Sequence, residues 1–256
     1  MTGEAAVRLN KYSEVRESIY GKHVRSSDML LTGLIYGCTA VSLLILVGIL
    51  GYTFVRGIPH VTWSFLSTAS SAVKGTFGIL GNIINTIYIV VITLLIATPI
   101  GVGSAVYLNE YAKPGKIVRM IEFTTETLSG IPSIIFGLFG MVFFGNTIGL
   151  GYSILTGSLT LTLMILPLIT RTTQEALKTV PDSYRHGALG IGATKWYMIR
   201  TILLPSAMPG ILTGVILAIG RIVGESAALL FTAGSGYYLP KNLFGKVLES
   251  GGTLTI

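Results

Sequence analysis

The apolar positions of this sequence fall in long blocks, rather than at every second position or along one face of a helical repeat. Five blocks reach the roughly 17–25 residues that a helix needs to cross about 30 Å of hydrocarbon. They cover Met29–Phe54, Ile79–Leu108, Leu128–Phe144, Tyr152–Thr170 and Leu204–Ala233. Because a bilayer offers no water to backbone polar groups, each block is expected to be a helix. The pattern therefore predicts an all-α integral membrane protein with five transmembrane helices.

The third block contains a cluster of residues that interrupt helices, running from Ser129 through Gly130 and Pro132 to Ser133. Proline removes a backbone donor and glycine weakens a helix, so a break is expected here. Backbone groups freed at membrane depth are tolerated where they lie beside a cavity or another protein segment. Ser129 and Ser133 are therefore candidate residues of a transport pathway.

Composition agrees with this picture, since 51% of the residues are hydrophobic and 11% are charged. The formal net charge of +7 reflects an alternating distribution of Lys and Arg. Five precede the first block, and the successive connections hold two, three, none and five, with two more after the last block. Basic residues accumulate on the cytoplasmic side of membrane proteins, which places the N-terminus and the second and fourth connections in the cytoplasm. The positive charge is thus a topology signal, and nucleic-acid binding is not expected.

The two ends of the chain complete the expected topology. Residues 1–28 are too polar for a signal peptide, so we interpret them as a cytoplasmic N-terminal segment, with residues 29–55 as a retained first transmembrane helix. Five spans that start inside leave residue 256 outside, after a Gly-rich stretch without a basic anchor. We therefore expect a sixth span to follow. Cys38 is the single cysteine, which excludes an internal disulfide and a cysteine-based metal cluster.

The last block carries small residues and two charges on one helical stripe. At 100° per residue, Gly210, Gly214, Ala218, Arg221 and Glu225 fall on the same face. Small residues on one stripe let another helix or a cavity come close. Residues four apart on a helix can form an ion pair, so Arg221 and Glu225 are expected to be able to pair.

Arg221 is expected to lie deep in the membrane. If the helix starts near Pro209, Arg221 is about 18 Å along it, close to the bilayer centre. An arginine at that depth costs about 2.5–3.5 kcal/mol on insertion scales, so a compensating role is expected. In one reading it contacts a passing oxyanion with its planar two-donor fork, and Glu225 holds or releases the guanidinium. In the other, the two residues form a permanent buried ion pair that joins helices or subunits.

The fourth connection, from Arg171 to Leu204, is basic, has helical spacing and contains a Gly-rich turn. It is either an interfacial amphipathic segment or a short helical pair that presents a knob to the groove of a soluble partner. Arg171 itself ends the fourth block. It is either an interfacial anchor or a contact for an anion that leaves on the cytoplasmic side.

This connection resembles the coupling loop of ABC importer permeases. In that family a Glu-Ala-Ala-like triplet precedes a glycine, and Leu-Pro follows further on. His186 stands where the family has glutamate, which removes a fixed negative charge but keeps the geometry set by the glycine. The residues that the resemblance assigns to ATPase docking are Arg185, His186, Gly187, Ala188, Gly192, Leu204 and Pro205.

Three further stretches, at residues 105–113, 129–137 and 219–225, resemble the phosphate importer permeases of the PstA type, and the likeness extends over residues 81–256. The resemblance implies a six-helix permease core, here residues 79–256 without the last helix, in the prokaryotic plasma (inner) membrane. It also implies alternating access that carries inorganic phosphate inward. The pathway residues would be Arg221, Glu225, Arg171, Ser129 and Ser133.

The resemblance further implies that this subunit is embedded in membrane lipid and has several protein partners. They are an ABC ATPase dimer that uses ATP and Mg²⁺, a second permease subunit of the PstC type, and a phosphate-binding protein. The chain has no Gly-x-x-x-x-Gly-Lys-Ser/Thr phosphate loop, so we expect it to be no enzyme, with no catalytic residue, cofactor or metal of its own. Transport of sulfate or molybdate instead stays open.

Two other classes of protein share some of these features. A secondary transporter or channel without an ATPase would account for the spans and for Arg221, but it leaves the long basic loop without a purpose. An intramembrane enzyme would need a nucleophile–base pair or a His-x-x-Glu-His arrangement, and the spans contain neither.

Overall fold

The computed structural model describes residues 26–71, 75–236 and 245–255 and divides into two compact units, Met1–Thr62 and Trp63–Ile256. In its described part, the first unit contains helix α2 (Ser26–Gly57) and the short 3-10 helix η1 (Ile58–His60). Every residue from 27 to 60 is exposed. A 34-residue apolar helix covers the predicted first span and extends past both of its ends. The predicted N-terminal segment lies almost entirely outside the described residues.

The second unit opens with helix α3 (Trp63–Ser67) and an antiparallel hairpin of β1 (Ala69–Ser71) and β2 (Thr76–Ile79). The hairpin is an addition to the predicted all-helical fold. It precedes helix α4 (Leu80–Val106) directly, so the second span begins as predicted to within a residue.

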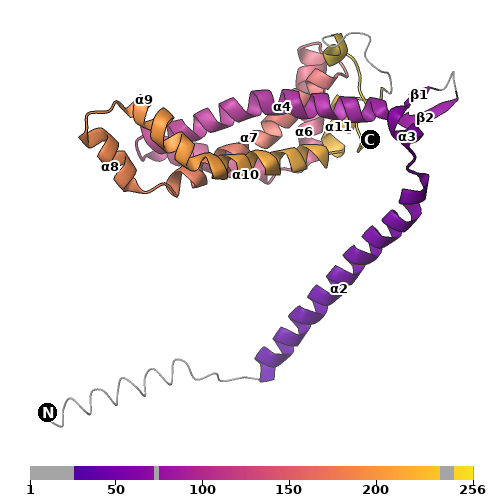
Figure 1. Cartoon of the computed structure of the whole chain (residues 1–256), viewed down its shortest axis with the longest axis horizontal. Coiled ribbons are helices and arrows are strands. Elements are labelled where there is room, and N and C mark those ends of the chain that lie inside the picture. The colour runs from indigo at the N-terminus through magenta and orange to yellow at the C-terminus, as the bar shows by residue number, and fades with distance from the viewer. Residues whose placement is uncertain (1–25, 72–74, 237–244, 256) are drawn as a thin grey trace. The chain divides into compact units, whose positions relative to one another are not determined.

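The core is a bundle in which α4, α7 (Ile154–Lys178) and α10 (Leu204–Val223) lie side by side (Figure 1). Helices α4 and α7 run in the same direction, since Thr93 meets Ser158 and, further along, Gly101 meets Ile169. A Cβ atom on Gly101 would lie 2.8 Å from Cγ2 of Ile169, so the glycine is what allows this close approach.

Helix α10 runs antiparallel to α7, with the predicted stripe of small residues in the contact. Gly210 faces Ala176, and Gly214 faces Thr172 one turn earlier on α7. Ala218, one turn further along α10, is completely buried. The α10 side of this contact consists of small residues, and these let the two backbones pack closely.

The third predicted block contains a helix break, as the cluster around Pro132 indicated. Helix α5 (Lys116–Ser129) and helix α6 (Ser133–Gly140), which continues into the π-helix η3 (Met141–Thr147), meet at an angle of 99°. The described residues thus contain four helices that are long and apolar enough to cross a membrane, or five if the bent pair counts as one. The orientation of the spans stays a prediction.

The end of the last predicted span, Leu204–Ala233, is wrong. A continuous helix runs from Lys195 to Val223, through α9 (Lys195–Met198), the π-helix η4 (Ile199–Leu203) and α10. Gly224 caps it, and a separate short helix, α11 (Ala227–Thr232), follows. Residues 224–226 separate the two helices, and the Glu225 carboxylate accepts a hydrogen bond at 3.1 Å from the N–H of Ala228 in the first turn of α11.

The last described segment contains the 3-10 helix η5 (Gly245–Leu248), and its non-helical residues 251–254 lie against the first turns of α4. Asn82 Nδ2 donates to the carbonyl of Thr253 at 2.8 Å, and Asn85 Nδ2 donates to that of Gly252 at 3.0 Å. The N–H of Leu254 donates to Thr86 Oγ1 at 3.1 Å. Side chains of α4 therefore supply the partners that this irregular backbone lacks.

Candidate functional site

A cavity of about 430 Å³ opens between α5, α7 and α10. It contains three of the predicted pathway residues, Arg171, Arg221 and Ser129, which come from three different helices. The complete lining is Leu108, Glu122, Thr125, Glu126, Ser129, Pro167, Leu168, Arg171, Gln174, Glu175, Lys178 and Arg221. The cavity therefore combines three cationic side chains with three carboxylates.

Arg171 is held by two of these carboxylates. Its Nε donates to Glu175 Oε1 at 3.3 Å, and its Nη1 lies 3.7 Å from Glu126 Oε1. The side chain is 57% exposed, so water screens both pairs and each contributes at most about 1 kcal/mol. Arg171 thus has defined partners that an incoming anion could replace at little cost.

Arg221 lies in the last turn of α10, half-buried, and differs from Arg171 in its partners. Among the described residues, no ion pair or hydrogen bond engages its side chain. The expected pair with Glu225 is wrong, because α10 ends at Val223 and the spacing of one helical turn no longer applies. Glu225 instead accepts a hydrogen bond from the Ala228 N–H at the start of α11, and it is absent from the cavity lining. The helix that carries Arg221 begins at Lys195 rather than near Pro209, so Arg221 lies close to the end of this helix, and its depth in the membrane stays a prediction.

The two predicted serines differ. Ser129 lines the cavity, but its hydroxyl donates to the carbonyl of Glu126 at 2.7 Å within its own helix. Ser133 starts α6 and is not among the lining residues of the described cavities. A helix break is present as expected, and it brings α5 to the cavity rather than exposing Ser133 there.

Several lining residues were not predicted from the sequence. Gln174, Glu175 and Lys178 follow Arg171 at spacings of three to four on α7, and this polar stripe is visible in the sequence. A second cavity of about 300 Å³ shares Gln174 and Lys178 with the first and includes Arg119. The charged lining thus continues past α5 toward the end of α4.

The fourth connection forms the predicted short helical pair, α8 (Asp182–Gly190) and α9, at the opposite end of the bundle from the hairpin (Figure 1). Gly192 joins them with a φ of +84°, a left-handed conformation that favours glycine. Next to it, the side chain of Ile191 is 87% exposed, and Leu189 is 48% exposed. The turn therefore presents an apolar tip, and Ile191 was not among the predicted docking residues.

The predicted docking residues divide into outward and inward positions. His186, Gly187 and Gly192 are exposed, as is Pro205 at the start of α10, while Leu204 is half-buried. Ala188 is 4% exposed and packs in a cluster that the loop shares with the ends of α4, α7 and α10. Arg185 points inward, where its Nη2 donates to Glu110 Oε1 at 3.0 Å. It therefore holds the loop in place and is not part of the loop's exposed surface.

No group of three or more His, Cys, Asp or Glu side chains in the described part of the chain is arranged to hold a metal ion. The chemistry of the cavity is therefore that of its guanidinium, ammonium and carboxylate groups. Such groups bind and orient an ion by charge and hydrogen bonds.

Comparisons with known proteins agree on one family. Residues 97–255 match the family described as the binding-protein-dependent transport system inner membrane component. A probable ABC transporter permease protein, YqgI of Bacillus subtilis, is 43% identical over 208 residues, 81% of this chain and 71% of that protein. The phosphate transport system permease protein PstA of Haemophilus influenzae is 35% identical over 219 residues, 86% of this chain and 77% of its own length. The PstC permease protein of Mesorhizobium japonicum is 34% identical over 220 residues, 75% of this chain and 66% of that protein.

Proposed function

This chain belongs to the binding-protein-dependent transport system inner membrane component family, and we propose that it is the transmembrane subunit of an ATP-driven importer of inorganic phosphate. As a member of that family with several apolar helices, it is a multi-pass protein of the prokaryotic plasma membrane. The proposed transport direction is from a phosphate-binding protein outside the cell to the cytoplasm. Its relatives named as phosphate transport permeases support this choice of anion.

The observation that carries the proposal is the position of Arg221 in the cavity without an ion-pair partner among the described residues. A half-buried guanidinium in a membrane protein is costly unless it has a partner, and an oxyanion fits its planar fork with two parallel hydrogen bonds. Arg171 is the second candidate contact. Its exposed pairs with Glu126 and Glu175 can open when phosphate oxygens approach, and re-form when phosphate leaves.

The energy source would be an ABC ATPase dimer that docks on the coupling loop around Ile191 and uses ATP and Mg²⁺. Permeases of this family lack an ATPase site of their own, and the sequence contains no phosphate-loop motif. A second permease subunit of the PstC type would complete the pore. Alternating access then follows if closure of the ATPase dimer displaces the loop and opens the cavity inward.

The test is phosphate uptake by the assembled transporter carrying Arg221→Gln. We expect uptake to be lost while membrane insertion and ATPase co-purification persist. Arg200→Gln is the matched control. Arg200 is an exposed arginine on the same continuous helix, and its side chain lines neither of the described cavities. Uptake that survives Arg221→Gln would contradict the pathway role.

Two further measurements separate the proposed function from its alternatives. Excess sulfate or molybdate should not compete with labelled phosphate; strong competition would identify another oxyanion as the substrate. Uptake should also require ATP inside the vesicles. Uptake that continues without ATP would indicate a secondary transporter or channel.

A further inference from the structure

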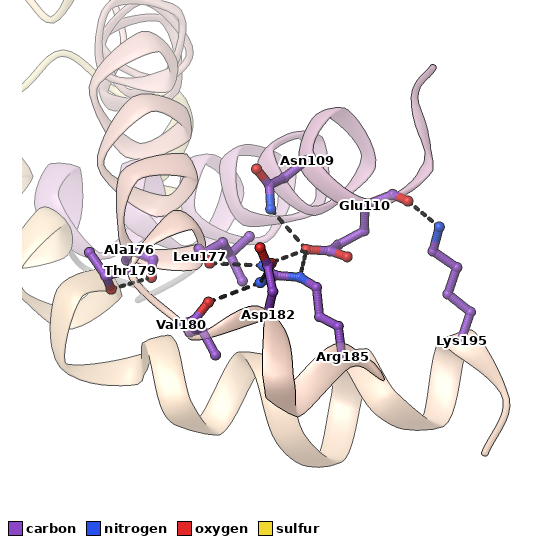
Figure 2. Close-up of polar contacts among 9 residues, drawn as sticks. All are labelled: Asn109, Glu110, Ala176, Leu177, Thr179, Val180, Asp182, Arg185 and Lys195. Atoms are coloured by element: carbon purple, nitrogen blue, oxygen red, sulfur yellow. Dashed lines mark hydrogen bonds and ion pairs between the residues drawn. The ribbon is translucent and has the colours of Figure 1, made fainter. Parts of the chain in front are cut away.

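A buried ion pair joins the coupling loop to the end of α4, which continues into the π-helix η2 (Tyr107–Tyr111). Nε and Nη2 of Arg185 donate to Glu110 Oε1 at 3.2 and 3.0 Å (Figure 2). The side chains are 16% and 5% exposed. Asn109 Nδ2 donates to the same carboxylate oxygen at 2.8 Å. Water therefore contributes little to this pair, and the protein holds both charges.

The same guanidinium also reaches the end of α7. Its Nη2 donates to the carbonyl of Leu177 and its Nη1 to that of Val180, both at 2.9 Å (Figure 2). Nη1 also donates to Asp182 Oδ1 at 3.0 Å, within the loop. One side chain of α8 thus connects η2, the end of α7 and its own helix.

A second contact ties α9 to the same π-helix. Lys195 Nζ donates to the backbone carbonyl of Glu110 and lies 4.9 Å from the centroid of the Tyr111 ring. Both halves of the coupling loop are therefore fastened to η2. Neighbouring η2 residues face the cavities, since Leu108 lines both of them and Asn109 lines the second.

A buried ion pair is a poor way to gain stability, because desolvation offsets most of its attraction, but breaking it leaves a buried charge without a partner. The pair therefore adds little to the stability of the fold, but it makes separation of α8 from η2 costly. We propose that the Glu110–Arg185 pair is a positioning contact that transmits displacement of the coupling loop into η2 and so to the cavity wall at Leu108. This inference rests on the proposed function, in which a partner ATPase moves the loop.

The test uses the complete transporter, reconstituted with its ATPase and phosphate-binding protein, and compares phosphate uptake with ATP hydrolysis. Glu110→Gln keeps the shape and an acceptor oxygen but removes the charge. We expect the ATPase to remain bound and hydrolysis to continue, while phosphate moved per ATP falls about tenfold, within the range typical of coupling between sites. Asp182→Asn is the matched control, because it removes a carboxylate from the same arginine without touching η2, and its ratio should stay at the wild-type value.

A double variant makes the test independent of folding defects. If the pair acts as a unit, Glu110→Gln with Arg185→Gln should lower phosphate moved per ATP no further than Arg185→Gln does, since partners in one contact are non-additive. An unchanged ratio in Glu110→Gln would overturn the proposal. So would loss of the ATPase from that variant, because the pair would then only shape the docking surface. Absence of ATP-dependent uptake in the wild-type complex would instead refute the proposed importer function.

Discussion

Arg171 and Arg221 line the same cavity from the two neighbouring helices α7 and α10, yet their surroundings differ. Arg171 lies beside Glu126 and Glu175, whereas Arg221 has no ion-pair partner in the part of the chain that the structure describes. The two arginines of this cavity therefore differ in whether a carboxylate of the described chain lies beside them. Under the proposed function, Arg221 would bind the anion without giving up another partner, and Arg171 would exchange its carboxylates for the anion.

Glu126→Gln separates the two interpretations of Arg171. If Arg171 is an anion contact, the variant should retain phosphate uptake, since an exposed ion pair contributes at most about 1 kcal/mol to stability. Arg171→Gln should then reduce uptake strongly, by about tenfold or more. The measurement is the initial rate of phosphate uptake at matched expression. Equal losses in both variants would indicate that the ion pair itself is what matters.

The close contact between α7 and α10 predicts a position-specific effect of bulk. Gly214→Val places a side chain against Thr172, and overpacking of this kind typically costs about 1–3 kcal/mol. Thermal unfolding of the purified transporter should show a lower midpoint. Gly220→Val is the control, since a Cβ atom added at Gly220 on the same helix would meet no neighbouring atom within 4 Å. Equal destabilisation by both would point to helix propensity rather than packing.

Docking of the ATPase should depend on the apolar tip of the loop. Ile191→Ser removes a side chain that is 87% exposed, so the fold should be unaffected. If Ile191 is an interface hot spot worth about 2 kcal/mol, capture of the ATPase should weaken by about 30-fold. Co-purification at several ATPase concentrations measures this. Ile58→Ser, at an exposed isoleucine far along the chain in η1, should have no effect; unchanged capture in Ile191→Ser would place the dock elsewhere.

The contact between α4 and residues 251–254 predicts a further loss of stability. Asn85→Ala leaves the carbonyl of Gly252 without its donor in a buried position, which typically costs about 1–3 kcal/mol. Limited proteolysis of the membrane-embedded transporter should then cleave near this segment more readily. Thr213→Ala, which removes an exposed hydroxyl bonded within its own helix, is the control. Equal cleavage of the two variants would argue against this role for Asn85.

Hydrophobic blocks predicted the helices well, because crossing a membrane imposes a minimum apolar length that soluble folds lack. The break at Pro132 and the stripe of Gly210 and Gly214 were also readable, since both follow from local backbone and side-chain size. The end of α10 was not. Glu225 fits the helical stripe in the sequence, but in the structure the helix stops at Val223 and Glu225 bonds to the N–H of Ala228.

The sequence predicted which arginines contribute to the site, but it did not predict which carboxylates they contact. Arg221 stood out because charges in apolar blocks are rare, Arg171 stood out because it directly follows such a block, and the structure places both in one cavity. Glu126 comes to Arg171 only through the 99° bend between α5 and α6, an angle that no sequence pattern specifies. The Glu110–Arg185 pair was missed because its members lie on η2 and α8, 75 positions apart in the sequence, and no local pattern predicts that they meet.

Helix α7 has a consequence for how motion in this protein is measured. Of its most apolar stretch, 67% is buried, against 33% for the helix from Leu80 to Tyr111 and 28% for that from Lys195 to Val223. Its end also supplies the carbonyl of Leu177 to Arg185. Because α7 is the most buried of these helices, we expect it to move least, and a spectroscopic label on α7 is the best fixed reference for distance measurements. Distances taken from α7 outward to α5 and to the tip at Ile191 would record the transport cycle as two separate displacements.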